Sequence, residues 1–259
     1  MIRQFTGKLF NRNKLFLQLK QLYKSATSFR NVNIFAFLWL LFYLYLLICQ
    51  ILMFFASTFG NFLDKTFETS DSYVEMVPLK PLQLKAFTLC MRLATELKGE
   101  REVILFAYRT GDYDELNVWR ELDGRLSFYL SGDGVFFQVP ELGALKTHLC
   151  VTWDSSSGAA TVFMDGRKSL TKIYKKGHTI RAGGKVLLGQ DPDSYLGDYD
   201  AKQSFVGEVC DVNMWDSVLP DRTIKDLVSG KRVQRGNVFD WETIQLKISG
   251  TVEVIHREL

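Results

Sequence analysis

The sequence predicts an all-β sandwich with one short α-helix, preceded by a hydrophobic N-terminal helix. Three observations support this prediction. After residue 60, apolar residues recur with a period of two in short runs, clusters of Gly, Asp and Ser separate the runs, and a single segment has helical spacing. Many short strands of even spacing, divided by turn residues, are typical of sandwiches.

The N-terminal region divides into a basic leader and an apolar segment. Residues 1–33 contain seven Lys and Arg and no acidic residue, and residues 34–56 are uncharged throughout. As a helix, 23 such residues span a hydrocarbon core of about 30 Å, and the basic leader favours export of the chain beyond this segment. Segment 34–60 is therefore either a long signal peptide, cut near the small residues at 57–60, or an uncleaved signal-anchor. A third interpretation is that the natural start lies further along the chain.

Every interpretation places the domain at 61–259 outside the cytosol. This domain carries 25 basic and 29 acidic residues, so the overall charge of +3 comes from the leader. A mildly acidic domain has no electrostatic footprint for nucleic acid. Only three histidines occur in the chain, which leaves few residues for general acid–base catalysis.

The β-type runs follow one another from residue 86 to residue 248. A run at 160–164 ends at Asp165-Gly166, the dipeptide that most strongly predicts a two-residue hairpin. The remaining runs are at 86–93, 103–108, 126–130, 148–153, 185–188, 207–215 and 243–248.

One helix interrupts the strands near the C-terminus. Pro220 and Asp221 are typical of a helix start, Ile224 and Leu227 form an apolar stripe, and Gly230 is typical of a helix end.

Cysteine usage agrees with an oxidising compartment. Cys49 lies in the apolar segment, which leaves Cys90, Cys150 and Cys210 and therefore only one possible pair. Cys90 and Cys150 both lie in predicted strands, and a bridge between them would stabilise the fold by about 4 kcal/mol on the chain-entropy model. Cys210 is then either a buried apolar residue or an intermolecular link.

Two acidic segments offer ligands for a metal ion. One is the loop after residue 189, and the other is a patch some seventy residues earlier. Calcium takes six to eight oxygens from carboxylates, amides and backbone carbonyls, although composition alone fits a solvated acidic loop equally well. The acidic residues are Asp191, Asp193, Asp198 and Asp200, with Gln203 close behind, and Asp112, Asp114 and Glu115 in the second patch.

Four separated blocks, in this order and spacing, resemble the pentraxin family, and in particular its short members. They are His148-x-Cys150-x-Thr152-Trp153, the acidic segment 189–195, the segment 202–208 and Asn213-Met-Trp-Asp-Ser-Val-Leu-Pro220. The resemblance implies a flattened jelly-roll β-sandwich of the concanavalin-like kind, assembled as a homopentamer. It also implies two Ca²⁺ ions per subunit on one face and immune partners, including complement, on the opposite face.

The function implied by this resemblance is calcium-dependent, lectin-like pattern recognition in innate immunity. The expected ligands are phosphorylated or anionic groups: phosphoethanolamine-like head groups, acidic sugars, and cell-surface or microbial polysaccharides. The resemblance favours a secreted protein over the type II anchored form.

Carried over position by position, the family's calcium ligands fall on both acidic segments. Asp191 replaces a glutamate that bridges both ions in the family, so the second ion depends on the reach of a side chain one methylene shorter. Asp114 replaces an asparagine, and Asp112 is the nearest carboxylate to a position that Tyr113 occupies. The implied ligands are Asp112, Asp114, Asp191, Asp193, Asp200, Gln203 and the carbonyl of Pro192.

The resemblance also implies a ligand pocket beside the calcium site. Trp119 and Tyr129 fall at its aromatic walls, although ordinary sandwich packing is an alternative role for both. Gly134 stands where choline-binding members have a carboxylate, so we expect phosphoethanolamine or acidic sugars to bind better than phosphocholine. His148 is expected to be structural, and Trp153 to pack on the Cys90–Cys150 bridge.

Two other functions compete with this interpretation. A jelly-roll glycosidase needs two carboxylates flanking one bond, but Glu208 and Asp211 are three apart, and an ideal strand directs them to opposite faces. The second alternative is a type II membrane-anchored adhesion or scaffold protein with a pentraxin- or laminin-G-like ectodomain, supported by the apolar segment.

Overall fold

The computed structural model describes residues 59–65, 69–98, 101–195, 197–231 and 233–258. The leader at 1–33 and nearly all of segment 34–60 lie outside these residues; the described fold begins at Phe59, within the first strand. In the part of the chain that is described, no helix is long and apolar enough to cross a membrane.

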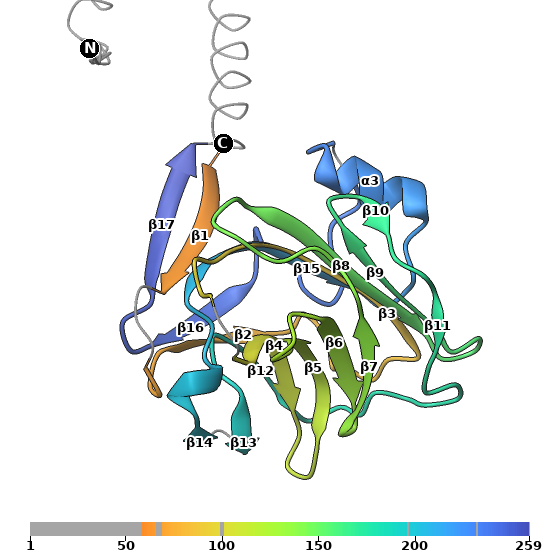
Figure 1. The fold of residues 1–259 in the computed structure, drawn as a ribbon, viewed down its shortest axis with the longest axis horizontal. Helices are drawn as coiled ribbons and strands as arrows, with labels where there is room; N and C mark the ends of the chain where they lie inside the picture. Colours follow the sequence, from red (N-terminus) through yellow and green to blue (C-terminus); the bar gives the residue numbers. More distant parts are fainter. Residues whose placement is uncertain (1–58, 66–68, 99–100, 196, 232, 259) are drawn as a thin grey trace, which may run out of the picture. The chain divides into compact units, whose positions relative to one another are not determined.

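Two antiparallel sheets face each other and enclose the core, which confirms the predicted jelly-roll sandwich (Figure 1). The eight-stranded sheet has the order β10-β9-β8-β3-β15-β1-β17, with β11 also paired to β9. Its strands are β1 (Phe59–Lys65), β3 (Ala86–Ala94), β8 (Thr147–Asp154), β9 (Ala159–Met164), β10 (Arg167–Lys168), β11 (Lys172–Ile173), β15 (Gly207–Trp215) and β17 (Glu253–Glu258).

The seven-stranded sheet has the order β16-β2-β12-β4-β5-β6-β7. Its strands are β2 (Tyr73–Val77), β4 (Val103–Arg109), β5 (Asp114–Arg120), β6 (Leu126–Leu130), β7 (Asp133–Phe137), β12 (Lys185–Leu188) and β16 (Gln245–Ser249). The small hairpin of β13 (Pro192–Ser194) and β14 (Gly197–Tyr199) leads into a 3₁₀ turn, η1 (Ala201–Gln203).

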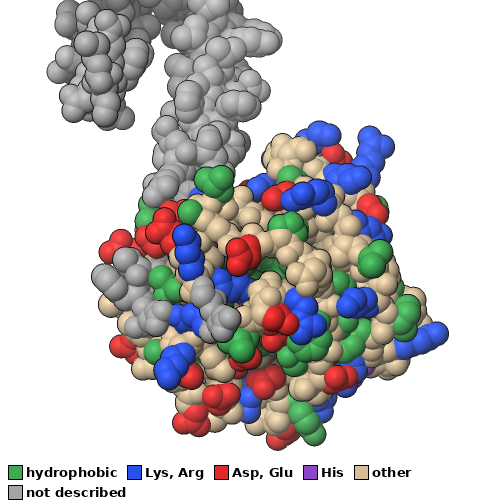
Figure 2. All heavy atoms as spheres, viewed as in Figure 1, with side chains coloured by type: hydrophobic (Ala, Val, Ile, Leu, Met, Phe, Trp, Pro, Cys, Tyr) green, Lys and Arg blue, Asp and Glu red, His purple; other side chains and the backbone are tan. Residues whose placement is uncertain are grey.

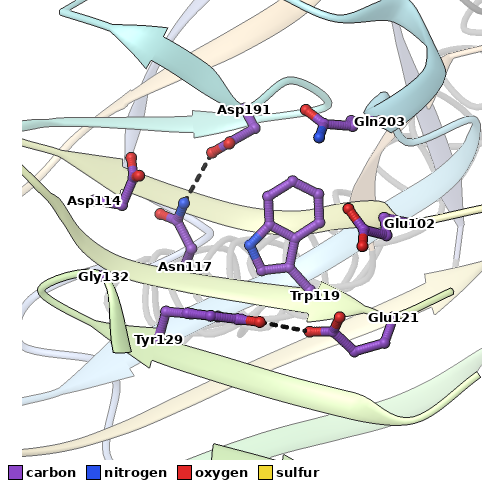
Figure 3. A pocket seen from close by; sticks show the side chains of 9 residues that line it. All are labelled: Glu102, Asp114, Asn117, Trp119, Glu121, Tyr129, Gly132, Asp191 and Gln203. Atoms are coloured by element: carbon purple, nitrogen blue, oxygen red, sulfur yellow. Dashed lines mark hydrogen bonds between the residues drawn. The ribbon is translucent and has the colours of Figure 1, made fainter. Parts of the chain in front are cut away.

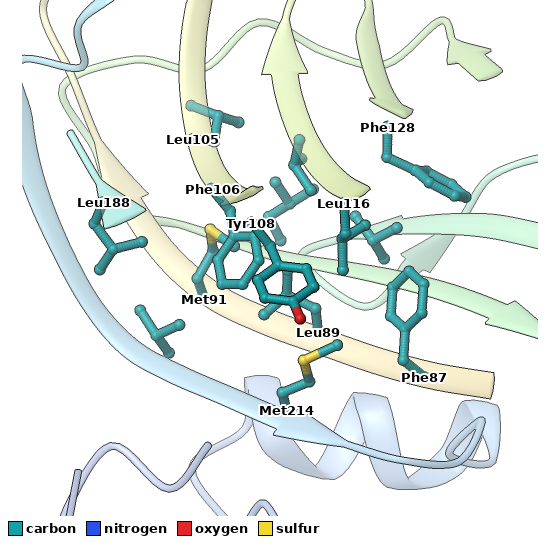
Figure 4. Close-up of a cluster of buried hydrophobic side chains, with 14 of the residues drawn as sticks. Phe87, Leu89, Met91, Leu105, Phe106, Tyr108, Leu116, Phe128, Leu188 and Met214 are labelled. Atoms are coloured by element: carbon teal, nitrogen blue, oxygen red, sulfur yellow. The ribbon is translucent and has the colours of Figure 1, made fainter. Parts of the chain in front are cut away.

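The main core lies between the two large sheets, where side chains of β3 and β15 meet those of β4, β5 and β6 (Figure 4). Phe87, Leu89 and Met91 alternate along β3 and are fully buried in this core. The residues between them are buried as well, because the opposite face of β3 is also covered. Burial on both faces explains why this strand is apolar almost throughout, whereas one-sided strands alternate.

The helix α3 (Asp221–Val228) covers the outer face of the eight-stranded sheet (Figure 1). Ile224 of the helix packs with Phe163, Trp215 and the two half-cystines. The Cys90–Cys150 disulfide is formed, as expected, and joins adjacent strands at directly paired positions.

Trp153 does not pack on the disulfide, so that expectation was wrong. Trp153 is buried in the main core beside Phe87, whereas Cys150 belongs to the cluster under α3. Residues three apart in a strand point to opposite faces, which separates the two side chains. Cys210 is a buried free thiol, and burial raises its pKa to about 12, which fits the role of an apolar residue.

Local sequence features predicted several elements correctly. Asp165 and Gly166 both have positive φ (50° and 74°) in the turn between β9 and β10, as a type I′ hairpin requires. The helix begins after Pro220, and Gly230 follows it with a φ of +67°. Strands β1, β2, β5, β7, β11 and β17 were not predicted, and the acidic segment expected to be a loop contains the β13–β14 hairpin.

Candidate functional site

A pocket of about 230 Å³ opens on the seven-stranded sheet, where β5 and β6 lie beside η1 and the turn after β12 (Figure 3). Strand β5 supplies three of its side chains, and the segment from β12 to η1 supplies two from a distant part of the chain. The lining residues are Glu102, Asp114, Asn117, Trp119, Glu121, Tyr129, Gly132, Asp191 and Gln203.

Asp191 is the most deeply placed carboxylate of this pocket, with 5% of its surface exposed. Asn117 donates from Nδ2 to Asp191 Oδ1 at 2.8 Å, and its own Oδ1 accepts from the backbone N–H of Tyr108 at 3.2 Å. Burial, together with the nearby charges of Asp114 and Asp193, raises the pKa of Asp191 to about 7. The pocket therefore disfavours a charged Asp191 unless a cation lies beside it.

Asp114 stands at the start of β5 and faces the same pocket (Figure 3). Its Oδ1 lies 2.5 Å from Nη1 of Arg109, the last residue of the neighbouring strand β4. Asp114 therefore has a cationic partner within the protein, whereas Asp191 has no ion pair among the described residues.

Gln203, at the end of η1, contributes a buried acceptor without a partner. Its Oε1 is excluded from solvent and accepts no hydrogen bond within the described structure. The turn that carries it is fixed by Asp200, whose Oδ1 accepts from the backbone N–H of Lys202 at 2.9 Å. A buried carbonyl oxygen without a donor, beside a buried carboxylate without a cation, is the donor set expected of an oxygen-ligated metal ion.

Not all predicted ligands line the pocket. Asp112 is exposed in the turn between β4 and β5, and Asp193 is exposed on β13. Glu115 is fully buried and turned away, because its carboxylate binds Arg181. Among the described side chains, the single group of three His, Cys, Asp or Glu ligand atoms within 4.8 Å is Cys90, His148 and Cys150, whose sulfurs form the disulfide.

The two predicted aromatic residues, Trp119 and Tyr129, both line the pocket. Tyr129 donates its hydroxyl hydrogen to Glu121 Oε1 at 3.2 Å, and burial, followed by the charge of Glu121, raises its pKa to about 12. The tyrosine ring also lies against Gly134 on β7, where a Cβ would approach within 2.7 Å of the ring. Because glycine has no Cβ, the Tyr129 ring can occupy the space beside residue 134.

Four lining residues were not predicted: Asn117, Glu102, Glu121 and Gly132. Asn117 and Trp119 are two apart on β5, and this alternation could have placed them on one face. The two glutamates are nineteen positions apart, before β4 and after β5, and only the pairing of these strands brings them together. No local pattern indicates that convergence.

Comparison with known proteins agrees with the fold. A family model described as the Pentaxin family matches residues 65–256. C-reactive protein of Danio rerio is 55% identical over 199 residues, which cover 75% of this chain and 88% of that protein. The chain belongs to the pentraxin family.

Other pentraxins support this assignment. Serum amyloid P-component of Cavia porcellus is 34% identical over 215 residues, covering 78% of this chain and 95% of that protein. The crystal structure of a heptameric SAP-like pentraxin from Limulus polyphemus superposes with a TM-score of 0.67 at 21% identity, covering 75% of this chain and 94% of that one, which shows a shared fold. Pentraxins are non-enzymatic binding proteins that generally bind calcium, and this chain is a binding protein of that family.

Proposed function

We propose that this pentraxin is a calcium-dependent pattern-recognition protein of innate immunity, which binds phosphorylated or anionic groups. The observation that carries the proposal is the buried Asp191 carboxylate, which has no ion pair in the described structure and lies in the same pocket as the unpartnered Gln203 carbonyl. Buried charges are normally paired or bound to metal, so the pocket is electrostatically incomplete without a cation.

Asp191, Asp114 and Gln203 would hold the calcium ion, with Asp193, Asp200 and the Pro192 carbonyl as further ligands from the same hairpin and turn. Bound calcium would supply the positive charge that attracts an anionic ligand to the mouth of the pocket. A second ion would need Asp191 to reach both metals, and Asp112, Asp193 and Asp200 to turn inward. We therefore propose one tight and one weak calcium ion per subunit.

The aromatic walls support a small ligand beside the ion. Trp119 and Tyr129 offer apolar surface next to polar groups, as binding sites for sugars and small head groups do. The Gly134 position has no carboxylate for a quaternary ammonium group, and Tyr129 covers it. We propose a preference for phosphoethanolamine and acidic sugars over phosphocholine.

Calorimetric titration of the full-length protein with Ca²⁺, followed by phosphoethanolamine, tests this function. We expect calcium binding and a phosphoethanolamine signal that a chelator abolishes. Asp191→Asn should lose both, whereas Asp123→Asn, which removes an exposed carboxylate in the β5–β6 turn, should keep both. Ligand binding that persists in chelator would contradict the proposal.

We further propose that the domain acts outside the cell as a ring of identical subunits. The Limulus relative is described as a heptamer, and the sequence resemblance implies a pentamer, so ring size is a property to measure. Light scattering gives the number of subunits. Mass spectrometry of the protein made by cells shows whether segment 34–60 is removed. Retention in the detergent fraction would favour the anchored adhesion or scaffold alternative.

A further inference from the structure

An arginine of the protein already pairs with one carboxylate of the proposed calcium site. Arg109 is the last residue of β4, and its Nη1 lies 2.5 Å from Oδ1 of Asp114 at the start of β5. Figure 3 shows that the Asp114 carboxylate faces the pocket near Asp191. A calcium ion bound there and the Arg109 guanidinium would therefore both interact with the same negative charge.

An irregularity in the pairing of β4 with β5 places Arg109 opposite Asp114. Tyr108 pairs with Leu116, so a regular antiparallel ladder would pair Arg109 with Glu115. The register shifts at this point, and Arg109 pairs with Asp114 instead. Glu115, the extra residue, is fully buried and does not line the pocket. Bulges redirect side chains in this way, so the sheet itself sets the position of the Arg109–Asp114 pair.

The Arg109 side chain has no second partner within the described residues. Its guanidinium bonds to Asp114, it is 15% exposed, and its Nε is buried without a hydrogen bond. A charge that is largely shielded from water interacts more strongly with its neighbours than an exposed charge does. Burial and the neighbouring carboxylates raise the pKa of Asp191, and Arg109 opposes that rise. Arg109 is thus electrostatically coupled to two of the proposed calcium ligands.

We propose that Arg109 is a built-in competitor of calcium, which neutralises Asp114 in the calcium-free protein and thereby lowers the calcium affinity of the site. This inference rests on the proposed function, because it concerns the regulation of the same site. The affinity of calcium sites depends on the net charge of their ligands. Arg109 cancels the charge of one carboxylate and repels an incoming cation.

The competition has a reciprocal consequence for stability. By thermodynamic linkage, calcium must weaken the Arg109–Asp114 pair by the same free energy by which this pair weakens calcium binding. Arg109 therefore stabilises the calcium-free protein more than the calcium-bound protein. A residue that only held Asp114 in position would behave differently, because its loss would lower the calcium affinity.

Calorimetric titration of the full-length Arg109→Gln variant with Ca²⁺ tests this inference. We expect calcium to bind about tenfold more tightly than to the wild type, because the competing charge is removed. In chelator, the variant should have a thermal unfolding midpoint about 3 °C below that of the wild type. This difference should vanish in saturating calcium, since the tighter binding of the ion then compensates for the lost ion pair.

Arg125→Gln is the matched control, because Arg125 pairs with Asp123 at 2.6 Å in the β5–β6 turn and does not line the pocket. Its calcium affinity should equal that of the wild type. Arg109→Lys keeps the positive charge, so its affinity should lie closer to the wild type than to Arg109→Gln.

The outcomes distinguish this inference from the proposed function. If the wild type binds calcium and Arg109→Gln binds it equally or more weakly, Arg109 is not a competitor, and the proposed function stands. A gain in affinity shared by Arg125→Gln would also overturn the inference, because the effect would then not depend on Asp114. If the wild type and all the variants bind no calcium, both proposals fail together.

Discussion

The outer faces of the two sheets are covered in different ways. Helix α3 covers the eight-stranded sheet through Ile224, Phe163, Trp215 and a disulfide, so apolar and covalent contacts complete that cover. The seven-stranded sheet has a smaller buried apolar cluster on its outer face, to which Tyr199 of the β13–β14 hairpin contributes. Among the described residues, the pocket beside this hairpin holds a buried carboxylate without an ion pair and a buried carbonyl oxygen without a hydrogen bond.

This difference indicates that the two outer faces have different roles. The face with the helix satisfies its own groups and stabilises the fold without a ligand. On the proposed function, the face with the hairpin leaves negative charge that a bound cation would balance, so its stability would depend on that ion. Separate perturbations of the two faces should therefore change stability and binding independently.

Removal of the disulfide should produce the largest change in stability. The bridge closes a sequence separation of 60, which predicts a loss of about 4 kcal/mol in the free energy of unfolding on the chain-entropy model. Urea unfolding of Cys90→Ala/Cys150→Ala measures this loss in the free energy of unfolding. Wild-type protein in reductant should lose a similar amount. Calcium stoichiometry, measured on the folded variant, should not change. A variant that folds but no longer binds calcium would contradict the independence of the two faces.

Acidification should weaken the helix-covered face through His148. Burial lowers the pKa of this histidine to about 4 from 6.5. The unfolded chain therefore binds more protons between these pH values, so stability is complete above pH 6.5 and is lost as the pH falls toward 4. The shift corresponds to a contribution of about 3 kcal/mol.

Urea unfolding at pH 7 and pH 4 tests this contribution. His148→Gln removes the titration, so the stability difference between the two pH values should shrink by about 3 kcal/mol relative to wild type. In calcium-free protein, Asp191 acts in the opposite direction, because its raised pKa favours the folded state as the pH falls. The comparison of variant with wild type cancels that effect. An unchanged difference would show that His148 is not buried in its neutral form.

The same comparison shows which features a sequence can predict. The face with the helix follows from local signals: the Asp165-Gly166 turn, the Pro220–Gly230 helix and two cysteines in strand-like runs. The exception is Trp153, which was predicted to pack on the Cys90–Cys150 bridge. Trp153 lies three residues after Cys150 on β8, so the two side chains point to opposite faces of the sheet.

The face with the hairpin is less predictable because its site depends on long-range pairing. Family resemblance indicated Asp191, Gln203 and the two aromatic residues, all of which line the pocket. Asn117 was missed although its alternation with Trp119 could have placed it, whereas Glu102 and Glu121 were missed because only the pairing of β4 with β5 brings them together. Bulges between these strands shift side chains in a way that residue spacing alone does not reveal.

Replacement of Asp191 should have opposite effects with and without calcium. The rise of its pKa from 3.8 to about 7 sets an upper limit of about 4 kcal/mol on the cost of ionising this group in the calcium-free fold. Loss of the charge-assisted hydrogen bond from Asn117 offsets about half of that gain. We expect Asp191→Asn to stabilise the calcium-free protein by about 2 kcal/mol at pH 8.

The same variant should lose the stabilisation that calcium gives to the wild type, about 2.7 kcal/mol at one hundred times the dissociation constant. Thermal unfolding with calcium and with chelator measures both effects. The exposed Asp123→Asn variant should follow the wild type in each condition. Destabilisation of the calcium-free protein by Asp191→Asn would mean that the hairpin-covered face is complete without an ion.

The smallest change in stability is expected at Gly134, where ligand binding and folding should separate. The backbone there is not left-handed, so alanine is tolerated, but its Cβ would lie 2.7 Å from the Tyr129 ring and would displace it. Tyr129 would then leave the pocket wall and its bond to Glu121. We expect Gly134→Ala to weaken phosphoethanolamine binding about fivefold, while unfolding changes by less than about 1 kcal/mol and calcium binding is retained.

Gly132→Ala is a demanding control for that result, since Gly132 lines the same pocket just before β7 but has a φ of +76° and open space where alanine would add its Cβ. Alanine at 132 should reduce stability through backbone strain of about 1 kcal/mol and should leave the Tyr129 ring in place. Comparison of ligand affinity and stability in the two variants thus distinguishes loss of the Tyr129 wall from backbone strain in the turn. If Gly134→Ala lowered stability but not affinity, Tyr129 would be a packing residue of the sheet, and the aromatic wall of the pocket would consist of Trp119 alone.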